Sequence, residues 1–482
     1  MNGTTATAQP APHRLLAQSL IFMGMSLAVI SSLGAPLIPQ IATSYHVSLA
    51  VAQWSLTITL LAGAIATPVF GRLGDGPHRR TVTYVAIGAA LAGCVLAALP
   101  LGFTELLVGR ALQGVGVALT PLAIATARDN LPEARAKSTV SMVSIATAAG
   151  VGLGYPLTGL IAQGLGLHAA FWFGALMSAG SLFAARAVLP ATRHLTHRPL
   201  DKTGALLLGL GLAGILVVLS DGGTWGWASV RVILLAVLSV LVLAIWVVHE
   251  LRTRHPLVDL RVARSRAVVA ANVIIVLLGI GLYLMMSLVT RLAQAPTLTG
   301  YGFGASIAVT GLALLPFSVT SVLANKGETA LGRRMSARHV LILACGIFLL
   351  SQICFALAHS ALWHMFLAMG VMGLGVGCAF AVIPNLVVRA VPANETGSAI
   401  SFNQVLRCVG YTIGSALSAT VLQASTPAGK LLPTSGGYTM ASLVGIALAL
   451  LTVLVAVTLA PRHAAARTAV THTAPEGTPV GR

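Results

Sequence analysis

The stretch GRLGDGPHRR, residues 71–80, decides how this chain is organised. It gathers one aspartate, one histidine and three arginines between two long apolar runs, 51–70 and 81–101. A membrane-spanning helix takes roughly 20 apolar residues. A short charged link between two such runs therefore predicts a membrane hairpin.

The composition extends this pattern to the whole chain. Of 482 residues, 56% are hydrophobic and 8% are charged, and the mean hydropathy is +0.90. So few polar side chains cannot cover a soluble surface. The sequence predicts an all-α polytopic membrane protein with fourteen transmembrane helices, in apolar runs that begin near residues 16, 51, 81, 103, 139, 168, 203, 231, 267, 305, 339, 361, 397 and 439.

The distribution of the basic residues behind the net charge of +18 indicates which connections are cytosolic. With a cytosolic N-terminus, 24 of the 29 Lys and Arg residues fall in the tails and alternate connections on the cytosolic side. Arg231, Arg291 and Lys430 fall on the opposite side, and Arg110 and Arg407 lie within helices. This asymmetry follows the positive-inside rule, so we expect both termini in the cytosol and no nucleic-acid partner.

An internal repeat indicates two related halves. Gly150 and Gly154 recur as Gly410 and Gly414, at an offset of 260 residues. Six spans at about 35 residues each need only roughly 210. Two extra helices between two six-helix bundles explain the difference, which predicts a 6+2+6 arrangement. The predicted segments are a cytosolic N-terminal segment (1–15), a six-helix bundle (16–190), a linker with two extra helices (191–265), a second six-helix bundle (266–460) and a disordered cytosolic tail (461–482).

The opening stretch also resembles the signature loop between the second and third helices of the major facilitator superfamily. Matches to the family pattern are Gly71, Leu73, Asp75, Arg79 and Arg80. His78 stands where the family has a second glycine. The resemblance implies the major facilitator fold and a conformational latch made by these residues; a solvated hairpin that only sets topology is the alternative.

Other elements resemble the fourteen-helix drug:proton antiporter branch of that superfamily, which expels multiple drugs and antibiotics. Arg110 and Gln113 match its RxxQGxG element. A glycine face resembles its antiporter motif, with Tyr155 in place of an expected proline; the face is formed by Gly150, Gly154, Pro156 and Gly159. Asn403 and Arg407 follow its pattern in the second half.

Polar groups inside predicted spans are candidates for coupling. A charged group near the bilayer centre costs about 2.5–3.5 kcal/mol on insertion scales, so each needs compensation. Structural pairing and a role in proton or substrate coupling both remain open for this set, which comprises Glu105, Arg110, Gln113, Asn403 and Arg407.

The family fold implies a substrate cavity between the two halves. Aromatic and methionine side chains suit apolar ligands of varied shape, although ordinary helix packing is the alternative for each residue. The candidate lining residues are Ser31, Ser32, Trp54, Asn272, Tyr283, Met286 and Gln404, with Gln113 and Asn403 beside them.

The first span departs from the drug exporters. Ile30 occupies the position where they often carry a membrane-embedded aspartate. A buried carboxylate with a raised pKa usually carries proton coupling and cation recognition, so its absence argues against dicationic substrates. Coupling could instead use Glu105, Asp221, Asp75, His168 or His364.

Together these features predict a secondary transporter of a bacterial cytoplasmic membrane. We expect it to export a hydrophobic or amphipathic small molecule in exchange for protons, as a monomer in the lipid bilayer, without a cofactor and without enzymatic activity. No phosphate-binding ATP loop is present in the sequence. The alternatives are a lipid or metabolite transporter not coupled to protons, and a membrane scaffold or sensor that does not transport.

Overall fold

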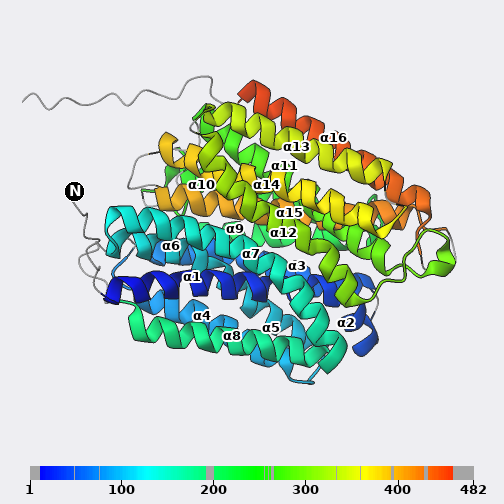
Figure 1. Ribbon diagram of the computed structural model, residues 1–482, viewed down its shortest axis with the longest axis horizontal. Helices are drawn as coiled ribbons and strands as arrows, with labels where there is room; N and C mark the ends of the chain where they lie inside the picture. The colour runs from blue at the N-terminus through cyan, green and yellow to red at the C-terminus, as the bar shows by residue number, and fades with distance from the viewer. Residues whose placement is uncertain are drawn as a thin grey trace, which may run out of the picture.

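The regular elements of the described chain are all helices (Figure 1). The computed structural model describes residues 11–47, 49–74, 76–190, 200–254, 256–258, 260–261, 265–332, 334–358, 360–391, 396–427 and 432–459. Asp75 of the predicted latch and the predicted tail, 461–482, lie outside these ranges, as does most of the predicted N-terminal segment.

The first part of the chain holds the helices that precede the predicted linker. A proline just after Gly34 and glycines around residue 116 interrupt regular α-helical hydrogen bonding. The fourth span therefore consists of two α-helices joined by a 3-10 turn. The elements are α1 (Ala11–Ser32), η1 (Ala35–Leu37), α2 (Ile38–Ser44), α3 (Leu49–Gly74), α4 (Arg79–Ala98), α5 (Phe103–Val115), η2 (Gly116–Ala118), α6 (Leu119–Asn130), α7 (Glu133–Leu165) and α8 (Leu167–Val188).

Three later helices begin at side-chain caps. Asp201, Ser229 and Ser265 each accept a hydrogen bond from a backbone N–H in the first turn that follows. Such caps satisfy donors that have no partner within the helix. The remaining elements are α9 (Lys202–Trp225), α10 (Val230–Arg252), α11 (Arg266–Gln294), η4 (Thr297–Thr299), α12 (Ile307–Leu331), α13 (Ala337–Leu357), α14 (Leu362–Ala390), α15 (Thr396–Ala424) and α16 (Ser435–Leu459).

Within the described ranges, thirteen helices are long and apolar enough to cross a membrane. They match thirteen of the predicted runs. The run expected near residue 139 lies in α7, which is a continuous helix of 33 residues but is not among the thirteen. Several side chains of α7 lie outside the described residues, so no described stretch of this helix has the length of a span. The all-helical membrane class is confirmed, and the fourteenth span stays a prediction.

The repeated glycines make equivalent contacts in the two halves. A Cβ atom at Gly150 would lie 2.7 Å from the carbonyl oxygen of Met25 in α1. A Cβ atom at Gly410 would lie 2.6 Å from the carbonyl oxygen of Val276 in α11. Only glycine allows backbones to approach so closely. The pairs α7 with α1 and α15 with α11 are thus packed in the same way.

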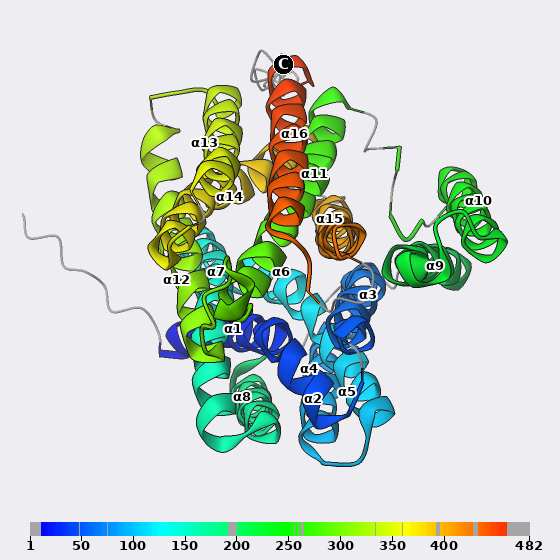
Figure 2. The ribbon, with the colours of Figure 1, turned by 90° about the vertical axis from the view of Figure 1, so that its right-hand side faces the viewer.

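Helices α9 and α10 lie to one side of the other helices (Figure 2). One hydrophobic cluster joins Leu208 and Leu212 of α9 to Ala64 of α3 and to Val405 of α15. The outer helix, α10, exposes a run of apolar side chains that lipid would cover: Ile233, Leu234, Val237, Leu238, Val240 and Leu241. The inner helix of this pair therefore contacts both the early and the late part of the chain.

Candidate functional site

Arg110 is fully buried in α5 and is held by two acceptors. Its Nε donates to the carbonyl oxygen of Ser55 at 3.0 Å, and its Nη1 donates to Oε1 of Gln113 at 2.6 Å. Gln113 in turn donates through Nε2 to the carbonyl oxygen of Gly93 at 3.2 Å. The predicted pair therefore bridges α3, α5 and α4.

The third nitrogen of this guanidinium has no hydrogen-bond acceptor among the described residues. Nη2 of Arg110 points at the residues between helices α1 and η1, where a Cβ atom on Gly34 would clash with it. The absence of a side chain at Gly34 makes room for the arginine. The break in the first span and the buried charge therefore belong to one arrangement.

Glu105 does not hydrogen-bond to Arg110 in the described structure. It lies in the first turn of α5, where the positive end of the helix dipole stabilises a carboxylate. Tyr45, which follows α2, lies nearby: burial raises the pKa of its phenol, and the negative charge of Glu105 raises it further. Glu105 thus belongs to the α2 end of the molecule.

The predicted latch lies at the opposite end, between α3 and α4. Arg79 is 7% exposed; its Nε donates to the carbonyl oxygen of Gly74 at 2.6 Å, and its Nη1 donates to Oδ2 of Asp129 in α6 at 2.5 Å. Arg80 turns the other way, and its Nε donates to the hydroxyl of Tyr84 at 2.8 Å. Arg79 therefore ties the loop to α6.

The other latch residues have backbone positions in or near the same loop. Gly71 and Leu73 form the last turn of α3, and Leu73 is 36% exposed. His78 is the residue at which α4 begins, but its side chain makes no capping hydrogen bond. Their role as a latch stays a prediction.

The residues of the antiporter motif face two different neighbours. Gly154 lies against α1, where an added Cβ would clash with Oγ of Ser32. Gly159 lies against α12, and its Cβ would be 2.9 Å from the carbonyl oxygen of Ile307. A Cβ at Gly311 of α12 would similarly lie 2.9 Å from Cα of Pro156. One end of α7 thus packs within its own half and the other packs across the two halves.

Several predicted cavity residues are engaged elsewhere. Ser31 and Ser32 donate to carbonyl oxygens of their own helix, those of Leu27 and Val29. Trp54 points to the extra helices, and its Nε1 donates to Oδ1 of Asp221 in α9 at 3.4 Å.

Asn403 and Asn272 join α15 to α11. Nδ2 of Asn403 donates to Oδ1 of Asn272 at 2.9 Å, and both side chains are buried. Gln404 follows on α15 and is partly buried. This amide pair stabilises the second half beside the central helices.

Arg407 is surrounded by aromatic rings. Its guanidinium carbon lies 5.1 Å from the ring centre of Phe380 and 5.9 Å from that of Tyr411, within the range of cation–π attraction. Tyr411 stacks on Tyr283 at 4.3 Å between ring centres. This stack connects the arginine to a residue of the cavity wall.

A cavity of about 260 Å³ opens between the two parts of the chain. Of the predicted lining residues, the structure places Tyr283 and Met286 in its wall, where the hydroxyl of Tyr155 donates to the sulfur of Met286 at 3.9 Å. Its full lining is Ile38, Pro39, Gln53, Leu56, Tyr155, Tyr283, Met286, Ser287, Thr290, Arg291, Gln294, Ala295, Pro296, Leu314, Ser415, Leu432, Pro433 and Tyr438.

Gln53 crosses from one half to the other at this cavity. Its Nε2 donates to the hydroxyl of Ser415 in α15 at 2.7 Å. Pro39, Pro296 and Pro433, which lie in or near connections between spans, place the cavity toward the α2 end. Two helix pairs, α3 with α15 and α7 with α12, thus join the halves around it.

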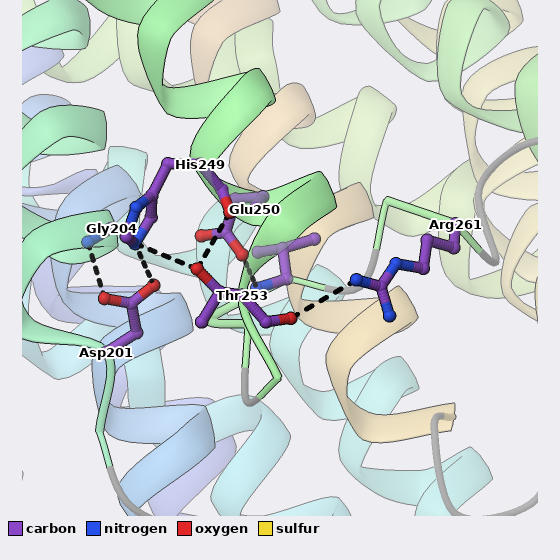
Figure 3. Close-up of polar contacts among 7 residues, drawn as sticks. Asp201, Gly204, His249, Glu250, Thr253 and Arg261 are labelled. Carbon is purple, nitrogen blue, oxygen red and sulfur yellow. Dashed lines mark hydrogen bonds and ion pairs between the residues drawn. The ribbon is translucent and has the colours of Figure 1, made fainter.

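A second polar cluster lies at the ends of the extra helices, and sequence reasoning missed it (Figure 3). Oδ2 of Asp201 lies 2.8 Å from Nε2 of His249, while Oδ1 caps α9 at Gly204. Glu250 is fully buried, and its Oε2 accepts from the backbone N–H of Val258 at 3.3 Å. Asp201 at the start of one helix and His249 near the end of another are 48 positions apart, so the sequence gives no local signal of this contact.

The fold and site can be compared with known proteins. The sequence model of the Major Facilitator Superfamily matches residues 15–415 and 329–480. The chain is 26% identical over 392 residues to the multidrug resistance protein Stp of Mycobacterium tuberculosis, covering 80% of this chain and 72% of that protein. It is 27% identical over 280 residues to the lincomycin resistance protein LmrB of Listeria monocytogenes, covering 58% of each.

A solved structure shares the fold. The peptide transporter POT in complex with sulfate aligns with a TM-score of 0.65 at 17% sequence identity, over 95% of this chain and 96% of that one. At this identity the likeness shows the fold alone. The multi-pass helical architecture and the predicted family resemblance therefore agree with both comparisons.

Proposed function

Because the chain belongs to the major facilitator superfamily, we propose that it exports hydrophobic or amphipathic drugs or antibiotics across the cytoplasmic membrane of a bacterium, by proton antiport and alternating access. The carrying observation is the cavity between the halves, whose wall includes Leu56, Tyr155, Tyr283 and Met286. Apolar and aromatic walls with few polar groups suit amphipathic small molecules. The relatives named for multidrug and lincomycin resistance support the same assignment.

The proposed topology has fourteen spans in a 6+2+6 order with both termini in the cytosol. It adds α7 to the thirteen apolar helices, and the equivalent glycine contacts of α7 and α15 support it as a span. Basic side chains then concentrate on the cytosolic face. Since both halves of one chain line the cavity, a monomer suffices as the working unit.

Alternating access is supported by the contacts between the halves. Near the proposed outer face, Gly159 and Gly311 bring α7 against α12, and Gln53 bonds to Ser415. At the proposed cytosolic face, Arg79 ties the loop after α3 to α6. Opening the cavity outward requires the first set of contacts to separate. The latch at the other face is placed to favour one of the two conformations.

The experiment is an efflux assay in a bacterial host that lacks its own exporters. Cells that carry the chain should resist a panel of antibiotics and should extrude a fluorescent drug, and a protonophore should abolish the extrusion. Arg110→Ala and Asp75→Ala should lose resistance at equal expression. Extrusion that survives collapse of the proton gradient would point to an uncoupled transporter of lipids or metabolites.

A different result would remove the transport proposal altogether. If neither substitution changes resistance or efflux of any compound on the panel, a scaffold or sensor describes the chain better. Expression and membrane insertion are checked on the same cells by detection of a C-terminal tag, so that loss of protein is not mistaken for loss of transport.

A further inference from the structure

One face of α11 forms a graded wall of the cavity. Six lining residues occupy positions i, i+3, i+4, i+7, i+8 and i+11, which places them on the same side of a helix: Tyr283, Met286, Ser287, Thr290, Arg291 and Gln294. An α-helix rises 1.5 Å per residue, so Tyr283 and Arg291 are separated by about 12 Å along its axis. The wall changes along this length from aromatic and apolar to hydroxyl-bearing and then to cationic.

Arg291 is the one formally charged side chain among the described residues that line the cavity. The described lining residues include no Asp, Glu or His. Across the described part of the chain, its guanidinium takes part in no hydrogen bond or ion pair with another side chain. Tyr438, another lining residue, has a phenol that is neutral near pH 7 and does not compensate the charge. The cavity therefore carries an uncompensated positive charge.

A second donor lies beside this charge. Nε2 of Gln294 is buried and has no acceptor in the described structure. A buried donor without an acceptor costs free energy, and the cost is recovered when an acceptor is supplied. Two donor groups, three residues apart on one helix face, can converge on a single acidic group. A carboxylate matches a guanidinium particularly well, because two parallel N–H to O bonds can form.

An arginine in the last turn of a helix can also serve only to complement the helix dipole. That role needs no cavity and works in water at the helix end. Arg291 instead shares the wall with Gln294 and Tyr438 and is only partly exposed. Dipole complementation also gives no reason for the neighbouring amide to lack an acceptor.

We propose that the cavity selects amphipathic anions, with the acidic group on Arg291 and Gln294 and the apolar or aromatic body along Met286 and Tyr283. This names the substrate class within the proposed function and rests on it. The absence of acidic lining residues removes the attraction that a cationic drug would need. The apolar half of the wall, with Leu56 and Leu314 opposite, excludes small hydrophilic anions by offering them no replacement for water.

The test is direct binding to the full-length protein in lipid nanodiscs, measured by equilibrium dialysis. The probes are 2-naphthoxyacetate and its neutral amide, 2-naphthoxyacetamide, which share the ring system and differ in charge. Wild-type protein should bind the carboxylate about tenfold more tightly or better, as expected for charge-assisted hydrogen bonds. Arg291→Gln should bring the ratio close to one while the affinity for the amide stays the same.

Three further variants keep the test decisive. Arg291→Lys should retain part of the preference, because it keeps the charge and loses the paired donors. Gln294→Ala should lower the ratio about threefold, and it serves if Arg291→Gln does not fold. Arg231→Gln is the matched control: it removes an exposed arginine from α10, away from the cavity, and should leave the ratio unchanged.

Equal binding of the two probes to wild-type protein would overturn the proposal, and so would a preference that persists in Arg291→Gln. Absence of carboxylate binding up to about 1 mM would overturn it as well. The assay needs neither a proton gradient nor a direction of transport. If the protein prefers the carboxylate but cells show no efflux, the exporter proposal is contradicted and the anion site is supported. If cells show efflux but the protein has no preference for the carboxylate, the anion site is contradicted and the exporter proposal is supported.

Discussion

Nη1 of Arg110 donates to Oε1 of Gln113 over 2.6 Å, at a depth where the two residues are 0% and 1% exposed. The two lie one helical turn apart, so the interaction is local to α5. Its partners are not local, because Ser55 and Gly93 on two other helices accept the remaining hydrogen bonds. A short sequence element thus fixes the relative positions of three helices.

Truncation of Gln113 should destabilise this junction. Gln113→Ala removes an acceptor from a buried arginine that already has one unpaired nitrogen, and it leaves the carbonyl oxygen of Gly93 without its donor. We expect a loss of about 1–3 kcal/mol, seen as a lower midpoint of thermal unfolding in detergent. Asn130→Ala, which removes a side-chain hydrogen bond to the chain's own helix at a partly buried site, is a control that should shift the midpoint much less. Equal shifts of the two midpoints would show that the hydrogen bonds of Gln113 contribute no more to stability than that of Asn130.

Gly34 should tolerate no side chain. Gly34→Ala places a methyl group in collision with Nη2 of Arg110 and forces the buried guanidinium to move, at a cost of about 1–3 kcal/mol. The matched control is Gly88→Ala in α4, where a Cβ meets nothing within 4 Å and helix propensity should raise stability by up to about 1 kcal/mol. Thermal unfolding and drug resistance are measured for both. A neutral result at position 34 would mean that the first span can shift to accept the methyl group.

The two arginines of the latch should differ in importance. Arg79→Ala removes hydrogen bonds to Gly74 and Asp129 from a buried site, so we expect loss of about 1–3 kcal/mol together with a slower efflux rate. Arg80→Ala, which removes one bond to Tyr84 within the same helix, should cost no more than about 0.5 kcal/mol. Efflux rates at equal expression are the readout. Equal effects of the two substitutions would contradict the contact between the loop and α6 as the basis of the latch.

Asp201 should stabilise the extra helices in two separable ways. Asp201→Ser keeps a capping oxygen for α9 but removes the partner of His249, whereas Asp201→Ala removes both. The difference between them isolates the cap, at about 1 kcal/mol, and Ser229→Ala measures a comparable cap on α10. The three variants are compared by thermal unfolding. If Asp201→Ser is as unstable as Asp201→Ala, the interaction with His249 dominates and the cap contributes little.

The helices could be predicted from the sequence because each span is a local run of about 20 apolar residues, which is recognisable without knowledge of the neighbouring helices. The run near residue 139 was predicted in the same way, and the structure forms one continuous helix, α7, over it. Its small residues also allow close packing against α1 and α12, a contact that hydropathy alone does not indicate.

The direction of individual side chains was harder to predict. Lipid and protein interior are both apolar, so a membrane helix gives little sign of which neighbour each face meets. Trp54 was expected in the cavity and instead bonds to Asp221 of α9, while Tyr155, where the resembling motif has proline, lines the cavity.

Arg291 was missed for a different reason. The expected boundary placed it in an external connection, whereas α11 continues to Gln294 and carries the arginine into the wall. Arg291 lies eight residues after Tyr283, a predicted cavity residue, and residues eight apart lie on nearly the same face of an α-helix. That spacing could have indicated that Arg291 also faces the cavity.

The charge on Arg291 also has an electrical consequence. Among the described lining residues it alone bears a formal charge, so the site is positive when empty and neutral once a monoanion is paired with it. With alternating access, the empty site then moves charge through the bilayer and the loaded site does not. Each elementary charge exchanges about 2.3 kcal/mol with a membrane potential of 100 mV. In the proposed antiport cycle, a voltage that is negative inside therefore favours the return of the substrate-free, proton-carrying protein to the cytosolic face, and it does not resist the outward turn of the substrate-loaded protein.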